Sequence, residues 1–184
     1  MKQIASLIMS VALASSAFAG SVAYSGKGGK VVQPQMMAPS CDAFAPGFSI
    51  GLNATGFLPR NEFNDYKDAL GGGISGEYFF TENFGARLSY DAVATSGTLH
   101  IFNGDIILRA PIKSICIAPY ILVGGGFSVD GEKLGEYHAG AGLEVHLKSL
   151  QNVNLFGEGS YNWHSSNNRD ADFTLVRLGI KFHL

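Results

Sequence analysis

From Gly47 onward, apolar and polar side chains alternate along the chain with a period of two. This period is typical of β-strands with one apolar face, and no stretch shows a convincing helical period. The alternation recurs in eight stretches, at 47–58, 70–80, 84–95, 98–110, 117–129, 136–148, 152–163 and 173–184. Each stretch is about eleven residues long, which is the length that a tilted strand needs to cross a bilayer.

Most of these stretches separate into an apolar face and a polar face. In 84–95, for example, Phe84, Leu88 and Tyr90 oppose Arg87 and Asp91. The stretch 117–129 is apolar on both faces, so the pattern does not assign its residues to one side or the other.

The connections between the stretches are alternately short and long. Those after the second, fourth and sixth stretches are short, whereas 59–69 and 164–172, after the first and the seventh, are longer. Short turns at one rim and longer loops at the other are typical of bacterial outer-membrane barrels, although the short connection after the third stretch departs from this pattern. We therefore predict an all-β fold, an eight-stranded antiparallel up-and-down transmembrane β-barrel.

The composition of the polar face indicates on which side of the barrel it lies. A soluble barrel has its apolar residues inside, whereas a membrane barrel has them against lipid. Here the polar face carries few and nearly balanced charges, which suits a narrow lumen closed by ion pairs, because buried charges need partners. The residues expected in this lumen network are Glu77, Arg87, Asp91, Asp105, Arg109, Glu144, Glu158, Arg177 and Lys181. A soluble exported ligand-binding barrel is the alternative that this pattern leaves open.

Aromatic residues near the two ends of the stretches are expected to mark two membrane interfaces, where rings with one apolar and one wet side are favoured. One end has Tyr78, Phe80, Phe84 and Phe182, and the other has Phe57, Phe127 and Trp163.

The N-terminal region is predicted to be removed or unstructured. The first 19 residues have a positively charged start, an apolar stretch and a small-residue cleavage site at Ala17 and Ala19, which is typical of a secretory signal peptide. Residues 20–46 contain GKGGK and three prolines, so we predict a flexible periplasmic linker before a barrel at 47–184. The formal net charge of −2 argues against a nucleic-acid partner.

The last eight residues, RLGIKFHL, contain a motif with a known counterpart. Arg177, Gly179, Phe182 and Leu184 resemble the signal that the barrel-assembly machinery reads on outer-membrane proteins, with Leu184 where phenylalanine is commonest. We expect this machinery, and the lipid of the outer membrane, to be the partners of the chain.

Internal segments resemble the small outer-membrane β-barrel family that includes the membrane domain of outer membrane protein A. The segments are YFFTENFGARLSY at 78–90, APYILVGGGF at 118–127 and YHAGAGLEV at 137–145. The resemblance covers 47–184 and implies a porin-like eight-stranded barrel in the outer membrane of a Gram-negative cell. The functions that it implies are anchoring, envelope integrity, adhesion and, rarely, enzymatic activity, with no fixed catalytic set.

One segment resembles an enzyme motif. HSSN, from His164 to Asn167, resembles the H-x-S-N of lipid A deacylase barrels, in which a His activates a Ser to cut a lipid ester. His164 and Ser166 are therefore the candidate residues of an alternative function, a lipid A-modifying esterase. The parity of the stretch places His164 toward the lumen, whereas a His that cuts lipid should face lipid.

The two cysteines, Cys41 and Cys116, are both expected on the periplasmic rim, and the periplasm is oxidising. We predict a disulfide between them that ties the linker across the barrel mouth. Two free cysteines are the alternative.

The expected function is therefore non-enzymatic: envelope structure and integrity, or adhesion-like contacts through the loops, with at most a narrow pore. No cofactor and no metal ion are expected, because the histidines show no ligand spacing with cysteine. The chain is expected to be a monomer, and the sequence does not identify its surface partner.

Overall fold

The computed structural model describes residues 44–60, 67–130, 132–147, 150, 152–164 and 172–184. The predicted signal peptide, with Ala17 and Ala19, lies outside these residues, as does the predicted linker up to residue 43. No helix among the described residues is long and apolar enough to cross a membrane.

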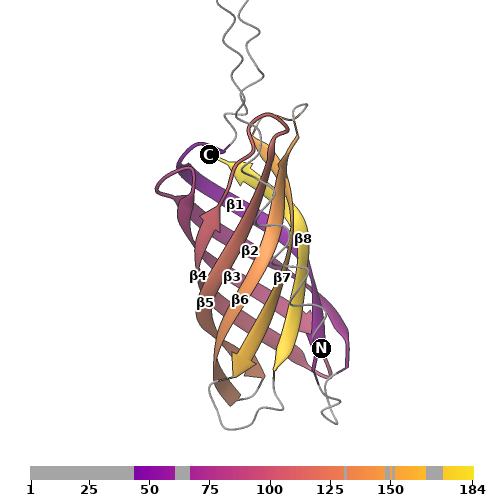
Figure 1. The fold of residues 1–184 in the computed structure, drawn as a ribbon. Helices are drawn as coiled ribbons and strands as arrows, with labels where there is room; N and C mark the ends of the chain where they lie inside the picture. The colour runs from indigo at the N-terminus through magenta and orange to yellow at the C-terminus, as the bar shows by residue number, and fades with distance from the viewer. Residues whose placement is uncertain (1–43, 61–66, 131, 148–149, 151, 165–171) are drawn as a thin grey trace, which may run out of the picture. The chain divides into compact units, whose positions relative to one another are not determined.

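The described residues form eight β-strands that close into a single barrel (Figure 1). The strands are β1 (Gly47–Pro59), β2 (Ala69–Phe79), β3 (Phe84–Ala94), β4 (Thr98–Arg109), β5 (Ile117–Asp130), β6 (Glu132–His146), β7 (Val153–His164) and β8 (Phe173–His183). Each strand pairs antiparallel with the next, and β8 pairs with β1 from Pro59↔Phe173 to Ser49↔His183. The predicted eight-stranded antiparallel up-and-down barrel is confirmed.

The predicted stretches match the strands closely, except at the start of β6. That strand begins at Glu132, four residues before the predicted start. Residues 132–135 pair with the end of β5, down to Asp130↔Glu132. Because EKLG lacks the alternation of a lipid-facing strand, the period-two pattern does not reveal this extension.

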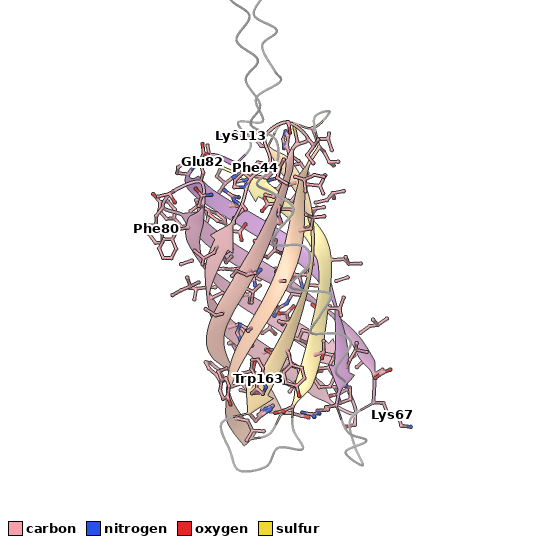
Figure 2. The ribbon with its side chains drawn as sticks, in the orientation of Figure 1. Phe44, Lys67, Phe80, Glu82, Lys113 and Trp163 are labelled. Atoms are coloured by element: carbon pink, nitrogen blue, oxygen red, sulfur yellow. The ribbon has the colours of Figure 1, made fainter. Side chains whose placement is uncertain are left out.

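The barrel has two ends, which we call the turn rim and the loop rim. The turn rim carries the turns at 80–83 and 110–116 and the start of β1. The loop rim carries the turn at 95–97, the end of β1 and the end of β7. In Figure 2, Phe44, Glu82 and Lys113 lie at the turn rim, and Lys67 and Trp163 lie at the loop rim.

The outer face of the barrel is apolar, and the inner face is polar. The side chains of Leu88, Leu178 and Ile74 are 73%, 65% and 55% exposed, and they project outward from β3, β8 and β2. By contrast, the charged residues of the same strands are buried in the lumen. This arrangement is that of a membrane barrel, and the alternative of a soluble barrel with an apolar interior is therefore wrong.

The structure assigns the two faces of β5. Ala118, Tyr120 and Leu122 are buried inside the barrel, whereas Ile121 and Val123 are exposed on its outer surface. Three aliphatic or aromatic residues thus point into a lumen that is otherwise polar, which explains why the alternation is absent from the sequence.

Aromatic rings form two belts on the outer surface. At the turn rim, Phe80 packs against Tyr78 and Phe84 and points away from the barrel (Figure 2). Toward the loop rim, the ring contacts are Tyr90–Phe102, Phe102–Phe127, Tyr137–Trp163 and Tyr161–Trp163. Phe57, predicted to belong to the second belt, is instead buried inside the barrel against Phe173, because it shares its parity with the inward residues of β1.

Candidate functional site in the barrel lumen

The lumen is filled by side chains at three levels along the barrel. A network of ion pairs occupies the middle of the lumen. The guanidinium of Arg109, stacked on the Phe79 ring, closes the turn rim, and an apolar cluster closes most of the loop rim. The polar side chains all come from inward positions, which alternate with the lipid-facing positions of the same strands.

Glu158 on β7 is the centre of the middle level. Its carboxylate accepts hydrogen bonds from Arg87 Nη1 at 2.7 Å, from Arg177 Nη1 at 2.9 Å and from Tyr120 Oη at 2.7 Å. These four residues stand on four different strands, β3, β5, β7 and β8. The contact of Arg87 with Glu158 crosses the lumen from β3 to β7, whereas Arg177 approaches Glu158 from the neighbouring strand β8.

Each of the two arginines also binds a second carboxylate, Arg177 across the lumen and Arg87 on the neighbouring strand. Arg177 Nη2 donates to Asp91 Oδ2 at 2.7 Å, and Asp91 Oδ1 accepts from Thr55 Oγ1 at 2.5 Å. Arg87 Nε donates to Asp105 Oδ2 at 2.7 Å. The second oxygen of the Asp105 carboxylate, Oδ1, is in close contact with His138 Nε2.

Closer to the turn rim, Lys181 on β8 lies between two glutamates. Its Nζ is 2.8 Å from Glu77 Oε1 and 3.4 Å from Glu144 Oε2. Asn154 Nδ2 donates to Glu144 Oε1 at 2.5 Å. Since Lys181 is 1% exposed, its ammonium group has exchanged water for these carboxylates and for the ring of Phe156, 4.9 Å away.

Arg109 closes the mouth at the turn rim. Its guanidinium carbon lies 3.6 Å from the ring centroid of Phe79 and 5.3 Å from that of Phe44. Its Nη2 donates to the Phe44 carbonyl at 3.0 Å, and its Nη1 is 3.5 Å from Glu144. Phe44 is 1% exposed, so this residue of the predicted linker range is packed into the barrel, whereas Ala45 and Pro46, which follow it, are exposed.

At the loop rim, an apolar cluster occupies one side of the lumen. It consists of Phe57, Val93, Leu99, Ile101, Phe173 and Leu175, all of them buried. These residues come from β1, β3, β4 and β8, and they exclude water from that half of the cross-section.

Two inward glycines make room for this network. At Gly142, an added Cβ would overlap the ring and hydroxyl of Tyr120 and lie 2.8 Å from Glu158 Cβ. At Gly124, it would overlap the Asp105 carboxylate and lie 2.9 Å from His138 Nε2. Gly124 on β5 and Gly142 on β6 are therefore explained by close packing in the lumen.

The structure brings all nine residues of the predicted lumen network into the barrel interior. Each of them lies within ion-pair distance of at least one other member. Sequence reasoning missed five participants, namely Phe44, Tyr120, Glu136, His138 and Asn154. The parity of β6 and β7 already placed His138 and Asn154 on the inner face, whereas Phe44 precedes the first alternating stretch and carried no signal.

The alternative catalytic pair is only partly described. His164 ends β7, and its ring lies 5.6 Å from that of Phe173, a buried member of the apolar cluster. Its backbone N–H donates to Asp172 Oδ1 at 3.3 Å. Ser166 lies outside the described residues.

The predicted disulfide is also only partly described. Cys116 is 1% exposed, has a positive φ of 60° and packs with Phe44 and Ala118 at the turn rim. Cys41 lies outside the described residues, so the pairing of Cys41 with Cys116 stays a prediction.

The residues of the predicted assembly signal are spread over both faces of β8. Arg177 is buried in the lumen, whereas Phe182 and Leu184 are on the outer surface. Leu184 N donates to the Phe48 carbonyl at 3.0 Å and extends the pairing of β8 with β1. The recognition of these residues by an assembly machinery stays a prediction. Within the described residues, no group of three or more His, Cys, Asp or Glu side chains is placed to hold a metal ion.

Solved structures with a similar architecture include bacterial β-barrel proteins and a designed transmembrane β-barrel. Neisserial surface protein A superposes with a TM-score of 0.58 at 13% identity, over 75% of this chain and 97% of that protein. The N-terminal β-barrel domain of Pseudomonas aeruginosa OprF gives 0.56 at 18% identity, over 76% and 99%. Ail, the attachment invasion locus protein of Yersinia pestis, gives 0.54 at 16% identity, over 76% and 99%.

No protein-family model and no curated protein sequence matches this chain. The likeness to the solved structures is one of fold, and it agrees with the apolar outer face, the two aromatic belts and the closed antiparallel sheet. The chain has the fold of the small eight-stranded outer-membrane β-barrels, the family that its sequence resembles.

Proposed function

We propose that this chain is a non-enzymatic outer-membrane barrel that stabilises the cell envelope and presents its loops at the cell surface, without conducting solutes. The observation that carries the proposal is the closed lumen. Side chains from opposite walls meet at Glu158, and the guanidinium of Arg109 and the Phe44 ring cover the turn rim.

A closed lumen is the expected result for eight strands, whose interior is only wide enough for side chains. A solute would have to break several ion pairs at once, among them those of Arg87 and Arg177 with Glu158. Breaking such buried pairs leaves charges without partners in a region that water does not reach, which is strongly unfavourable. The geometry therefore supports a rigid anchor rather than a pore.

The contacts of His164 support a non-enzymatic role. A His that cleaves the ester of a membrane lipid has to reach the lipid-facing surface. The His164 ring instead contacts Phe173 inside the loop rim.

Planar-bilayer recording tests the closed lumen. The purified barrel should give no stepwise conductance, whereas Glu158→Ala with Arg177→Ala, which removes the pairs of Arg87 with Glu158 and of Arg177 with Asp91 across the lumen, should give small openings. Stable openings of the wild-type protein would contradict the proposal.

A deletion strain tests the role in the envelope. Loss of the protein should raise sensitivity to detergents and large antibiotics, and the wild-type chain should restore resistance. A chain in which 59–69 and 164–172 are replaced by short Gly-Ser turns separates the two parts of the role. It should restore resistance if the barrel itself stabilises the envelope, and it should lose any cell-surface contact made by the loops. A deletion strain with unchanged resistance and unchanged surface contacts would contradict both parts.

A further inference from the structure

Glu136 on β6 differs from the other buried acidic residues of the barrel. Its side chain is 5% exposed and faces the lumen near the loop rim. Among the buried acids that the structure describes, it is the one without an arginine, lysine or histidine nitrogen within ion-pair distance. Ionisation of Glu136 would therefore place a negative charge in the lumen with no cation in contact.

The described part of the lumen has no spare cation for Glu136. Each of its four permanently charged bases lies within ion-pair distance of another acid. Burial of a carboxylate without a counter-charge is strongly unfavourable, whereas a neutral carboxylic acid carries no such cost. The four bases are Arg87, Arg109, Arg177 and Lys181, and the five other buried acids of the lumen are Glu77, Asp91, Asp105, Glu144 and Glu158.

The Asn103 amide satisfies one of the two oxygens of Glu136. With its nitrogen toward β6, the amide donates to Glu136 Oε1 at 3.0 Å and to the Phe102 carbonyl at 3.0 Å. Its oxygen then accepts from Arg177 Nη2 at 3.2 Å. The opposite orientation would place the amide nitrogen against the guanidinium, so the first orientation is the favourable one. Oε1 thus has a donor, and Oε2 remains the unpaired oxygen of Glu136.

A second buried oxygen without a hydrogen bond lies on the neighbouring strand. Asn162 on β7 is 0% exposed, and its Oδ1, like Glu136 Oε2, has no hydrogen-bond partner among the described atoms. In the ladder of β6 with β7, Glu136 pairs with His164 and His138 pairs with Asn162. Glu136 and Asn162 are therefore diagonal neighbours on the inward face, which is within the reach of long side chains.

Two acceptors without a donor are costly when buried, and one proton removes both defects. A proton on Glu136 Oε2 turns that oxygen into an O–H donor, and Asn162 Oδ1 is the acceptor that such a donor needs. The proton also removes the uncompensated charge.

Titratable and charged groups face Glu136 from the surrounding strands. Asp91 on β3 repels a negative charge at this position, and Arg177 on β8 attracts it from beyond the Asn103 amide. The Ser128 hydroxyl on β5 also interacts with the carboxyl group. The other titratable groups around this level are Asp105 on β4, Asp130 on β5, His138 on β6 and His164 on β7.

We propose that Glu136 is a proton-binding site of the folded barrel. In mild acid it is held as the neutral carboxylic acid, with its O–H donating to Asn162 Oδ1 and its Oε1 accepting from Asn103. In alkali the proton leaves, and the resulting carboxylate faces the Asn162 oxygen and Asp91. The link between β6 and β7 at the loop rim is therefore strengthened by acid and weakened by alkali, whether or not a solute passes through the lumen.

The pH dependence of stability tests this site. In the unfolded chain a glutamate has a pKa of about 4.3, so above about pH 5 the folded barrel binds one proton more than the unfolded chain. The wild-type folding equilibrium constant should then fall through this group by about tenfold per pH unit, until the folded barrel also releases the proton. Urea unfolding of the full-length chain in lipid vesicles measures the constant at each pH.

Glu136→Gln should lose this dependence, because its amide carries a permanent donor in place of the O–H. The ratio of its folding constant to that of the wild-type protein should rise at least about tenfold from about pH 5 to about pH 6.5. The histidines of the chain titrate in both proteins, so their contributions largely cancel in this ratio. Glu82→Gln is the matched control, because Glu82 is about half exposed at the opposite rim, and its ratio should stay constant. A constant ratio for Glu136→Gln would overturn the proposal.

Infrared spectroscopy of the folded protein observes the proton directly. At about pH 6, where an ordinary glutamate is ionised, the wild-type protein should show the C=O stretch of one protonated carboxylic acid. This band should be missing from Glu136→Gln. If that variant does not fold, Asn162→Leu replaces it, since the loss of the acceptor should shift the band to higher frequency. Absence of the band from the wild-type protein, its persistence in Glu136→Gln or an unshifted band in Asn162→Leu would contradict the proposed site.

Discussion

Single side chains in the lumen have several partners each, so the substitution of one side chain should remove interactions with several strands. We predict that Glu158→Gln destabilises the barrel by about 3–5 kcal/mol, because it leaves the guanidinium groups of Arg87 and Arg177 without their shared carboxylate. Urea unfolding of the barrel in lipid vesicles measures this difference.

Glu82→Gln serves as the comparison for Glu158→Gln. The pair of Glu82 with Lys113 is about half exposed, and exposed pairs contribute only about 0–1 kcal/mol. Equal effects of the two substitutions would show that the lumen network contributes no more than a surface pair.

The inward glycines give a second prediction at this scale. Gly142→Ala places a methyl group against Tyr120 and Glu158 and should cost about 1–3 kcal/mol. Gly135→Ala lies on the same strand but meets no atom within 4 Å, so it should be nearly neutral. Both are measured by the same unfolding assay, and a harmless Gly142→Ala would mean that the Tyr120 side chain can move aside.

Individual lumen residues were predictable to the extent that the alternation of faces was clean. The charged residues of β3, β7 and β8 follow directly from parity, since each stands between lipid-facing apolar neighbours. Glu136 has the same parity as His138 in the predicted stretch 136–148, so its inward face could have been predicted, but it was not singled out as a member of the network. The partners of each charge were not predictable, because they depend on how far each strand is shifted along its neighbours.

At the scale of strands, the boundaries followed from the alternation of apolar and polar residues with a period of two. The positions that depart from this alternation have physical causes. β5 has inward Tyr120 and Leu122, so its two faces are equally apolar and its orientation cannot be read from hydrophobicity. Phe57 and Phe173 are inward for a different reason. Their rings belong to the apolar cluster that closes the loop rim and excludes water there.

The segment before β1 gives a prediction at the same scale. Phe44→Ala removes a buried ring from the mouth of the turn rim, where it covers Arg109 and packs against Cys116. By analogy with core substitutions, it should destabilise the barrel by about 3–5 kcal/mol.

Phe80→Ala is the control for Phe44→Ala. Phe80 is 55% exposed on the outer aromatic belt at the same rim. In detergent, where no bilayer interface is present, this variant should unfold near the wild-type urea concentration. A Phe44→Ala protein as stable as Phe80→Ala would show that the mouth is held by the strands alone.

The predicted disulfide between Cys41 and Cys116 belongs to the same segment. We expect the protein to be isolated from the cell envelope in its oxidised form. After treatment with an alkylating reagent, it should gain the mass of two alkyl groups only if it has first been reduced. Ready alkylation of the unreduced, denatured protein would contradict the bond. Reduction should also lower the stability by about 2–4 kcal/mol, because the bond closes a long loop.

For the molecule as a whole, the apolar outer face and the charged interior imply a protein that folds only in an amphiphilic environment. We predict that the folded barrel migrates faster than the heated chain in detergent gels and stays with the outer membrane during mild detergent extraction. The physical reason is that the closed ladder leaves no free strand edge in the hydrocarbon region, so the sheet resists detergent until heat opens it. A protein that remains soluble without detergent, or one whose migration is insensitive to heating, would contradict this assignment.

The pairing of β8 with β1 has a consequence for how the strands are connected. In a closed ring no strand is structurally first, and the backbone at Phe48 already receives a hydrogen bond from Leu184 across the seam. Joining the two sides of this seam covalently and opening the chain instead at the turn 95–97 would keep the strand order around the ring. The barrel should therefore accept circular permutation, and the order in which its strands are synthesised is separable from the structure that they form.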